Sequence, residues 1–183
     1  MGLFATMPVD EVTVQDIASA VEMTPAAVYY HFSGKEELFS AAVNRVFQSI
    51  SEVVAAERGD DEPGSQASLD AVIDAVWNWI DDHPEEATLL YLQLPGATRQ
   101  ITTLRQEFEE EHAQRAFAYF GGGDGRGRPS AARRAMETLT VRTLIDLLIS
   151  VHTMRLADGP LSDEPGTKLR RAVHDLAARL VNA

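Results

Sequence analysis

The sequence has no cysteine, and this absence excludes several classes of protein. Without thiols there is no disulfide framework and no cysteine-based catalysis. No run of eighteen apolar residues occurs, so a transmembrane span is not expected. The opening residues, MGLFATMPVDE, have neither the basic start nor the apolar stretch of a secretory signal. These absences predict a cytoplasmic protein with no membrane partner.

Positive charge is also scarce. The 183 residues include 16 Lys and Arg against 28 Asp and Glu, a formal net charge of −12. Nonspecific binding to polyanions depends on clustered Lys and Arg, so this balance argues against it. A small DNA-reading module on an acidic body stays compatible with it. The length and the 45% apolar content suit one sizeable core, or a small domain joined to a larger one.

Motifs for enzymatic chemistry are lacking as well. The five histidines form no HExxH pattern, and Glu109-His112 lacks the second such unit that a diiron bundle requires. The stretch GGGDGRGRP at 121–129 lacks the Gly-Lys-Ser/Thr of a phosphate loop, which favours a connector. No Ser/His/Asp signature is present, and the acids within 107–112 are typical of a solvated face. We therefore expect no enzymatic activity, no metal and no cofactor.

Apolar residues recur at spacings of three and four almost everywhere, without sustained alternation. This periodicity predicts an all-α fold. The predicted helices cover residues 14–21, 25–32, 35–57, 68–83, 84–94, 98–120, 130–157 and 164–182.

Two short helices stand near the N-terminus. Thr13 is a candidate N-cap with Asp16 in the capping-box position, and Thr24-Pro25 forms a cap followed by an N1 proline. Each helix has barely two turns, so neither is stable alone. The long helix that begins at Lys35 supplies a third partner. The pattern predicts a helix-turn-helix with a following support helix.

The second short helix carries an unusual amount of aromatic area in residues 29–32, YYHF. Its hydroxyl and imidazole donors, with small alanines at its N-terminus, suit the positioning of backbone phosphates. Alanine methyls and tyrosines also suit contact with thymine methyls in the major groove. The alternative is that these aromatics fill a small core. That alternative is favoured for Tyr29 and Phe32, whereas Tyr30 and His31 fit both interpretations.

The stretch VTVQDIASAVEMTPAAVYYHFSGKEELF resembles the DNA-binding signature of the TetR family of bacterial transcriptional repressors. The residues that carry the resemblance are Thr13, Ile17, Ala18, Thr24, Tyr29, His31, Phe32, Lys35 and Leu38. The resemblance implies a DNA-binding domain over residues 1–48 and an all-helical effector-binding and dimerisation domain over 49–183. It implies that DNA phosphates are contacted by Thr13, Thr24, Tyr29, Tyr30, His31 and Lys35, and that base edges are faced by Pro25, Ala26 and Ala27.

The sequence departs from the family pattern in two places. Glu22 stands in the turn where the family usually has glycine, and a glutamate suits neither a positive φ nor a DNA-facing surface. The opening MGLFAT resembles only the last turn of the family's basic first helix. We therefore expect a truncated first helix, a native start further upstream, and a frayed stub at Leu3 and Phe4. Residues 1–48 hold six acids against two fixed cations, Lys35 and Arg45.

Two helices near the C-terminus are candidates for pairing between subunits. The helix over 130–157 is apolar around most of its circumference, so it must be buried on more than one side, and its Arg142 and Asp146 are spaced for an ion pair. The last helix has a single apolar stripe. The pattern alone is compatible with a monomer core, whereas the resemblance implies a homodimer with a four-helix interface. The candidate interface residues are Leu139, Leu144, Leu147, Val151, Leu169, Val173, Leu176 and Leu180.

A ligand pocket is the second feature that the resemblance implies. The candidate lining residues combine apolar bodies with a few polar tips, although each of them also fits an ordinary core position. They are Trp77, Tyr91, Leu94, Leu104, Phe108, His112, Phe117, Leu148, His152 and Met154. Such a lining predicts a mainly apolar small-molecule effector.

The resemblance predicts a ligand-responsive repressor that binds a palindromic double-stranded DNA operator as a homodimer. In the expected mechanism, ligand pivots the helix over 35–57 and changes the separation of the two recognition helices, to the extent that it binds the released state better. The acidic N-terminal region also permits another interpretation: a helical small-molecule-binding dimer that does not bind DNA.

Overall fold

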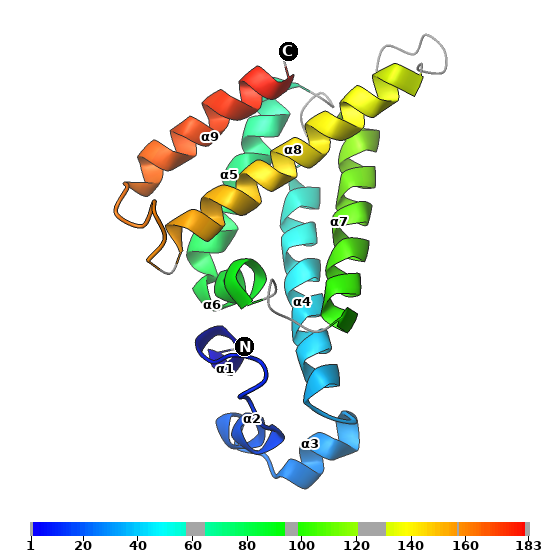
Figure 1. Ribbon diagram of the computed structural model, residues 1–183, viewed down its shortest axis with the longest axis vertical. Helices are drawn as coiled ribbons and strands as arrows, with labels where there is room; N and C mark the ends of the chain where they lie inside the picture. Colours follow the sequence, from blue (N-terminus) through cyan, green and yellow to red (C-terminus); the bar gives the residue numbers. More distant parts are fainter. Residues whose placement is uncertain (1, 58–64, 94–98, 121–130, 157, 182–183) are drawn as a thin grey trace.

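The computed structural model describes residues 2–57, 65–93, 99–120, 131–156 and 158–181, and in these ranges it has helices and no strand. Three short helices lie at one end of an elongated molecule (Figure 1): α1 Gly2–Thr6, α2 Val14–Ala20 and α3 Pro25–His31. The long helix α4, Lys35–Ala56, leads from this end into the helical body. The all-α prediction is confirmed. The other elements are α5 Gln66–Asp82, α6 Pro84–Thr88, the π-helical turn η1 Leu89–Gln93, α7 Arg99–Phe120, α8 Ala131–Arg155 and α9 Gly166–Val181.

The two helices of the helix-turn-helix, α2 and α3, begin at the N-cap residues that the sequence predicts. The Asp16 N–H donates to Thr13 Oγ1 at 3.2 Å, and the Thr13 N–H donates to Asp16 Oδ2 at 3.0 Å, which completes the capping box. Thr24 Oγ1 accepts from the Ala27 N–H at 3.2 Å, and Pro25 takes the first helical position. These local bonds fix where α2 and α3 begin.

The first helix is short but packed, and the expectation of a frayed stub is wrong. Phe4 is only 5% exposed and meets Phe39 of α4 edge to face, with ring centroids 5.0 Å apart. Leu3 is partly buried against the same cluster. Because Phe39 lies at the base of α4, α1 is held against the long helix by apolar burial.

One apolar cluster continues from the helix-turn-helix end into the body of the molecule. It includes Phe4 and Val12 near the N-terminus, Val46 of α4, Trp79 of α5 and Leu89 of η1. The Trp79 indole N–H also donates to Ser49 Oγ of α4 at 2.9 Å. Helix α4 therefore crosses the predicted boundary at residue 48 inside a shared core, and the division into 1–48 and 49–183 stays a prediction.

A second cluster joins α5, α8 and α9, with Ile73, Trp77, Val151 and Val173 at its centre. Helix α8 lies between α7 and α9 (Figure 1), so its apolar circumference is covered on more than one side. The predicted pairing of Arg142 with Asp146 is wrong. Arg142 instead forms an ion pair with Glu110, because α7 packs along that side of α8.

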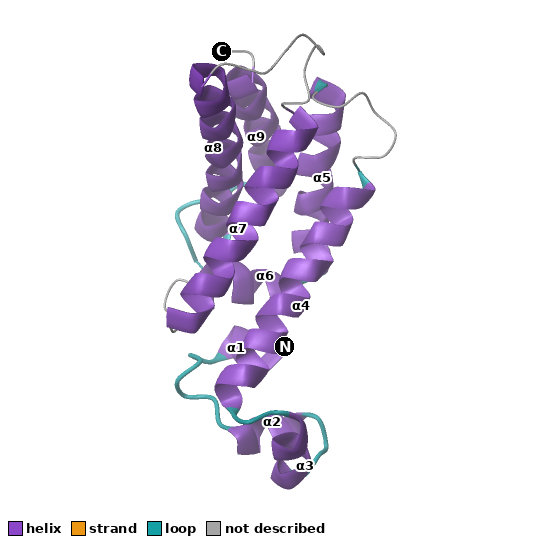
Figure 2. Ribbon diagram, turned by 90° about the vertical axis from the view of Figure 1, so that its right-hand side faces the viewer, coloured by secondary structure: helices purple, strands orange, loops and turns teal. Residues whose placement is uncertain are grey.

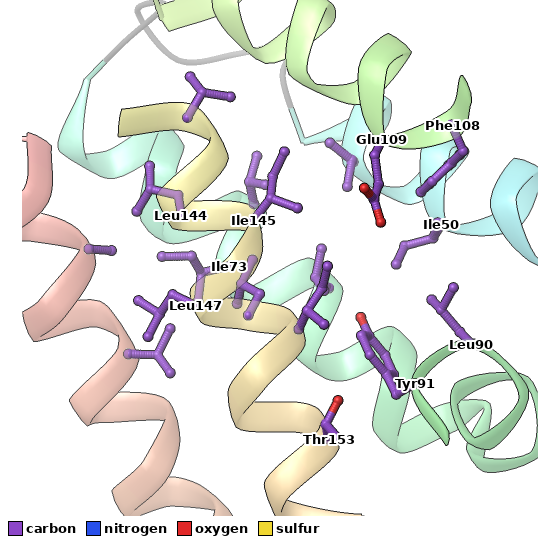
Figure 3. A pocket seen from close by; sticks show the side chains of 18 of the residues that line it. Ile50, Ile73, Leu90, Tyr91, Phe108, Glu109, Leu144, Ile145, Leu147 and Thr153 are labelled. Carbon is purple, nitrogen blue, oxygen red and sulfur yellow. The ribbon is translucent and has the colours of Figure 1, made fainter. Parts of the chain in front are cut away.

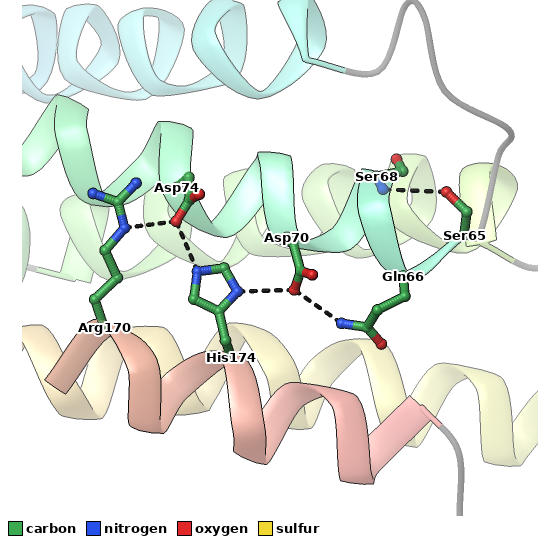
Figure 4. Close-up of polar contacts among 7 residues, drawn as sticks. All are labelled: Ser65, Gln66, Ser68, Asp70, Asp74, Arg170 and His174. Atoms are coloured by element: carbon green, nitrogen blue, oxygen red, sulfur yellow. Dashed lines mark hydrogen bonds and ion pairs between the residues drawn. The ribbon is translucent and has the colours of Figure 1, made fainter. Parts of the chain in front are cut away.

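A polar cluster also joins α5 to α9 (Figure 4). His174 contacts Asp70 Oδ1 through Nδ1 at 2.8 Å and Asp74 Oδ1 through Nε2 at 2.7 Å. Arg170 Nε donates to the same Asp74 oxygen at 2.6 Å, and its second nitrogen donates to Asn78 Oδ1 at 2.8 Å. Both imidazole nitrogens face carboxylates, so the ring is a double donor, which requires the charged imidazolium.

The segment over 84–94 differs from the single helix that the sequence predicts. Helix α6 ends at Thr88, and Leu89–Gln93 continue as a π-helical turn. Leu89 and Tyr91 are both buried there, with 1% and 6% exposure. Apolar spacing does not distinguish an i→i+4 from an i→i+5 turn, so the sequence pattern alone cannot place such a turn.

Candidate nucleic-acid interface and ligand cavity

The exposed face of α3 carries the predicted DNA-contacting aromatics. Figure 2 shows α2 and α3 at the tip of the molecule, beyond the lower end of α4. Tyr30 is 85% exposed and Tyr29 57% exposed, whereas Val28 is buried. The interpretation of Tyr29 as a core residue is therefore wrong, because Val28 supplies the buried contact of this short helix. Phe32, the other candidate core aromatic, is half-buried.

The remaining α3 positions form a compact surface beside the tyrosines. His31 is exposed, and its ring meets that of Tyr30 edge to face at 5.0 Å. Ala26 is exposed, while Pro25 and Ala27 are half-buried. The Thr24 hydroxyl is exposed but already accepts the capping bond described above. The arrangement presents hydroxyl and imidazole donors next to small side chains, which suits close approach to a phosphate backbone.

Two side chains that were predicted to contact phosphates form hydrogen bonds within the protein instead. Lys35 Nζ donates to the carbonyl oxygens of Val9 at 3.2 Å and Asp10 at 2.7 Å. The Thr13 hydroxyl donates to Asp16 Oδ2 at 2.5 Å while accepting the capping bond. An ammonium has three N–H donors, so Lys35 has one more to offer. The sequence pattern did not indicate that this lysine fastens the loop before α2.

Negative charge surrounds the same region. Hydrogen bonds from the Thr13 side chain and backbone lower the pKa of Asp16, and those from the Ser33 backbone and side chain lower the pKa of Glu37. Glu22 occupies the turn between α2 and α3 with a φ of 55°, the left-handed backbone conformation that the sequence comparison with the family indicated. This exposed acid lies three residues before the start of α3.

A cavity of about 210 Å³ lies inside the helical body, between α4, α5, η1, α7, α8 and α9 (Figure 3). Most of its wall is aliphatic or aromatic. The polar side chains in the wall are Tyr91, Arg105, Glu109 and Thr153, and Arg105 Nε lies 3.7 Å from Glu109 Oε1. The apolar wall includes Phe47, Ile50, Ile73, Phe108, Leu144, Ile145, Leu147 and Leu148.

The structure brings only part of the predicted pocket lining to this cavity. Tyr91, Phe108 and Leu148 line it, whereas Trp77, His152, Leu104 and Met154 do not. Leu94 and the side chains of His112 and Phe117 lie outside the described residues. The residues missed on α4 and α5, such as Ile50 and Ile73, are ordinary members of apolar stripes. No sequence signal separates them from neighbours that pack against protein.

Trp77 and His152 instead belong to a buried junction between α5 and α8. His152 is fully buried, with its ring 4.8 Å from that of Trp77, and its Nδ1 accepts from Arg155 Nε at 2.8 Å. Arg155 also pairs with Asp81 at 2.7 Å and lies over the Trp77 ring. Burial and the nearby guanidinium lower the pKa of His152 to about 3, so the imidazole is neutral near pH 7.

The predicted interface residues differ in their burial within the protomer. Val151, Leu169 and Val173 are buried within the protomer, while Leu144 and Leu147 line the cavity together with Val173. Leu180 is half-buried. Leu139 and Leu176 are 58% and 45% exposed, which leaves them available to a second subunit. Met136 and Val181, which the sequence reasoning did not single out, are exposed on the same two helices.

Two kinds of feature are absent from residues 2–57, 65–93, 99–120, 131–156 and 158–181: a metal site and a membrane span. In those ranges, no three His, Asp or Glu side chains are grouped so that they could hold a metal ion. None of the helices described there is long and apolar enough to cross a membrane.

Comparison with known sequences identifies relatives of the N-terminal region. Residues 1–42 match the sequence model of a family described as bacterial regulatory proteins, tetR family. The chain is also 27% identical over 120 residues to IcaR of Staphylococcus aureus, which is described as an HTH-type negative transcriptional regulator of the biofilm operon icaADBC. That match covers 61% of this chain and 62% of the relative's length, so the chain spans less than two thirds of that relative.

Solved structures share the fold over nearly the whole chain. A TetR-family transcriptional regulator from Streptomyces coelicolor superposes with a TM-score of 0.72 at 22% identity, covering 98% of this chain and 75% of that one. A TetR-like regulator from Rhodococcus sp. RHA1 gives a TM-score of 0.73 at 18% identity, covering 97% and 88%. At these identities the likeness concerns the fold.

Proposed function

We propose that this chain, whose N-terminal region belongs to the tetR family of bacterial regulatory proteins, is a ligand-responsive transcriptional repressor. It binds a palindromic DNA operator as a homodimer in the cytoplasm, and a mainly apolar small molecule releases it. The observation that carries this proposal is the exposed α3 face, where Tyr29, Tyr30 and His31 lie beside the capped N-terminus of a helix-turn-helix. In an ordinary amphipathic helix, large aromatic side chains such as these two tyrosines are expected on the buried face and not in water.

Helix α4 supplies the connection between the two activities. Near its start, Phe39 packs against Phe4 of the helix-turn-helix end, and further along, Phe47, Ile50 and Val54 form part of the cavity wall. A ligand that binds one orientation of α4 better than another shifts the orientation of α3 by that difference in affinity. In a two-fold dimer, such a shift changes the separation of two recognition helices that must meet half-sites about 34–36 Å apart.

The test is fluorescence anisotropy with the duplex that lies directly upstream of the gene, at several salt concentrations. The unaltered chain should bind with an affinity that falls as salt rises, because phosphate contacts release counterions. Tyr30→Ala should weaken binding by about tenfold, which corresponds to about 1.4 kcal/mol. Tyr30→Phe should fall between the two if the hydroxyl meets a phosphate. Since Tyr30 is 85% exposed, neither change should lower the melting temperature.

Gln106→Ala is the matched control, because Gln106 is exposed on α7, outside the α3 face. It should leave DNA affinity unchanged. Equal affinity of the Tyr30→Ala variant and the unaltered chain would contradict the assignment of the α3 face.

A second candidate function has one observation in its favour. Lys35 donates to the Val9 and Asp10 carbonyls, which leaves it one free N–H, in a region where six acids outnumber the cations Lys35 and Arg45. That charge balance favours a small-molecule-binding dimer that does not act on DNA. This candidate would be supported over the repressor if the chain binds its ligand but binds no DNA, or binds DNA with an affinity that does not change with salt.

A further inference from the structure

The cavity lies beside a second, polar hollow on the molecule's surface. This acidic cleft, about 440 Å³ between α4 and α7, is lined by Asn44, Phe47, Gln48, Ser51, Glu52, Leu104, Glu107, Phe108 and Glu111. Phe47 and Phe108 belong to both linings, so they form the partition between cleft and cavity. Their rings stack in parallel, with centroids 3.9 Å apart and planes 7° apart. The two hollows are thus separated by a pair of aromatic side chains.

The charged side chains around the two hollows are mostly negative. Three carboxylates line the cleft, and a fourth, Glu109, extends into the cavity (Figure 3). Among the described residues that line the two hollows, Arg105 supplies the one guanidinium beside these carboxylates. Walls of low dielectric strengthen such a field, and the field raises the local concentration of ligands of opposite charge.

Two polar groups inside the cavity retain binding capacity. Glu109 Oε1 is 3.7 Å from Arg105 Nε, beyond hydrogen-bond distance, so the carboxylate can accept from another donor. The Tyr91 side chain is only 6% exposed, and its hydroxyl points into the cavity (Figure 3). Among the described residues, none forms a hydrogen bond with this hydroxyl. Burial raises the pKa of Tyr91, so the hydroxyl stays protonated. A hydroxyl that faces an apolar cavity from a buried side chain marks a place where a ligand atom can complete the bonding.

We propose that the effector is a lipophilic cation: an apolar body bearing one positively charged nitrogen, which reaches the cavity through the acidic cleft and past Phe47 and Phe108. Its apolar part fills the aliphatic wall, and its charge lies against Glu109 and the aromatic faces. Cations are attracted to aromatic faces as well as to carboxylates, whereas an anionic amphiphile would meet four carboxylates on this path. The inference rests on the proposed function, because it names the chemical class of the effector.

The test is isothermal titration calorimetry with decyltrimethylammonium and decanoate, each below its micelle-forming concentration and at the same ionic strength. These probes share the decyl body and differ in the sign of the head group. The cation should bind about tenfold more tightly than the anion, a preference typical of one close charge interaction. Glu109→Gln keeps the shape of the side chain, and it should remove most of that preference.

Glu110→Gln is the matched control, because it removes the same charge from the same helix outside both hollows. It should leave the preference intact, and circular dichroism should show both variants folded. Equal or tighter binding of decanoate would overturn the proposal, and so would binding of neither probe.

DNA anisotropy in the absence of any probe keeps the two proposals separate. If the unaltered chain binds no DNA but still prefers the cationic probe, the repressor function alone would be overturned. Retained DNA binding with no cation preference would overturn the ligand class alone.

Discussion

Glu22 stands at the turn between α2 and α3 with a φ of 55°, a conformation that glycine adopts without a steric penalty. Glu22→Gly should therefore raise the free energy of unfolding by about 1 kcal/mol, since a side chain in the left-handed region costs about that much. Glu22→Gln keeps the strained conformation and removes only the charge, so it should leave stability unchanged. Urea unfolding of the three proteins measures the difference.

DNA affinity separates the charge of Glu22 from its conformation. The glutamate precedes the recognition helix, so its carboxylate repels phosphates if α3 docks as proposed. Both substitutions should then tighten binding by about two- to fivefold, on the scale of one exposed charge interaction. A gain for the glycine variant alone would mean that the turn geometry, and not the charge, limits affinity.

The elements themselves were largely predictable. Caps at Thr13 and Thr24 and the breaks at Gly34 and before Pro84 are local signals, so the helix bounds follow from nearby residues. The π-helical turn at Leu89–Gln93 and the packing of Phe4 were not predicted. Both depend on contacts with elements distant in sequence, which a helical period does not encode. The same limit explains why Tyr91 was found as a cavity residue while Ile50 and Ile73 were missed.

The contact between α5 and α9 depends on charge as well as apolar burial. Burial lowers the pKa of His174, but the hydrogen bonds that its ring donates to Asp70 and Asp74 outweigh this effect, so the net pKa is raised. For Asp74, burial raises the pKa, and the bonds from Arg170 and His174 outweigh that effect and lower it. On α5 the groups facing the ring are two carboxylates, and on α9 Arg170 shares Asp74 with it.

This arrangement predicts a pH-dependent stability. Because the folded pKa of His174 is raised, its contribution is complete below the unfolded pKa of about 6.5 and is lost as pH rises through the folded value. His174→Gln should therefore lower the free energy of unfolding by on the order of 1 kcal/mol at pH 6, and by much less at pH 9. Urea titrations at the two pH values measure this.

Lys168→Met is the control for the His174 experiment. Its ion pair with Glu164 is exposed, so its removal should change stability little at either pH. A cost of His174→Gln that is the same at pH 6 and pH 9 would mean that the ring acts by packing and not by charge.

Under the proposed function, the assembly determines whether one α3 helix or two can meet DNA. The apolar stripes of α8 and α9 contain residues in three kinds of environment: protomer core at Val173, cavity wall at Leu147, and exposed surface at Leu139 and Leu176. The sequence pattern does not distinguish these environments. A helical period identifies a buried face without saying what buries it. The exposed members, with Met136, are therefore the positions where association can be tested without damaging the protomer.

Leu139→Arg is expected to yield a folded monomer. Leu139 is 58% exposed in the protomer, so the arginine variant should keep the helical circular dichroism spectrum of a folded chain, while a charge buried without a partner in a two-fold interface disfavours association. Sedimentation velocity should show a dimer for the unaltered chain and a monomer for the variant. Met23→Arg, at an exposed apolar residue of the helix-turn-helix, is the control that should stay dimeric. If Leu139→Arg sediments as a dimer, the two subunits meet elsewhere. Their recognition helices would then be related by a different two-fold axis.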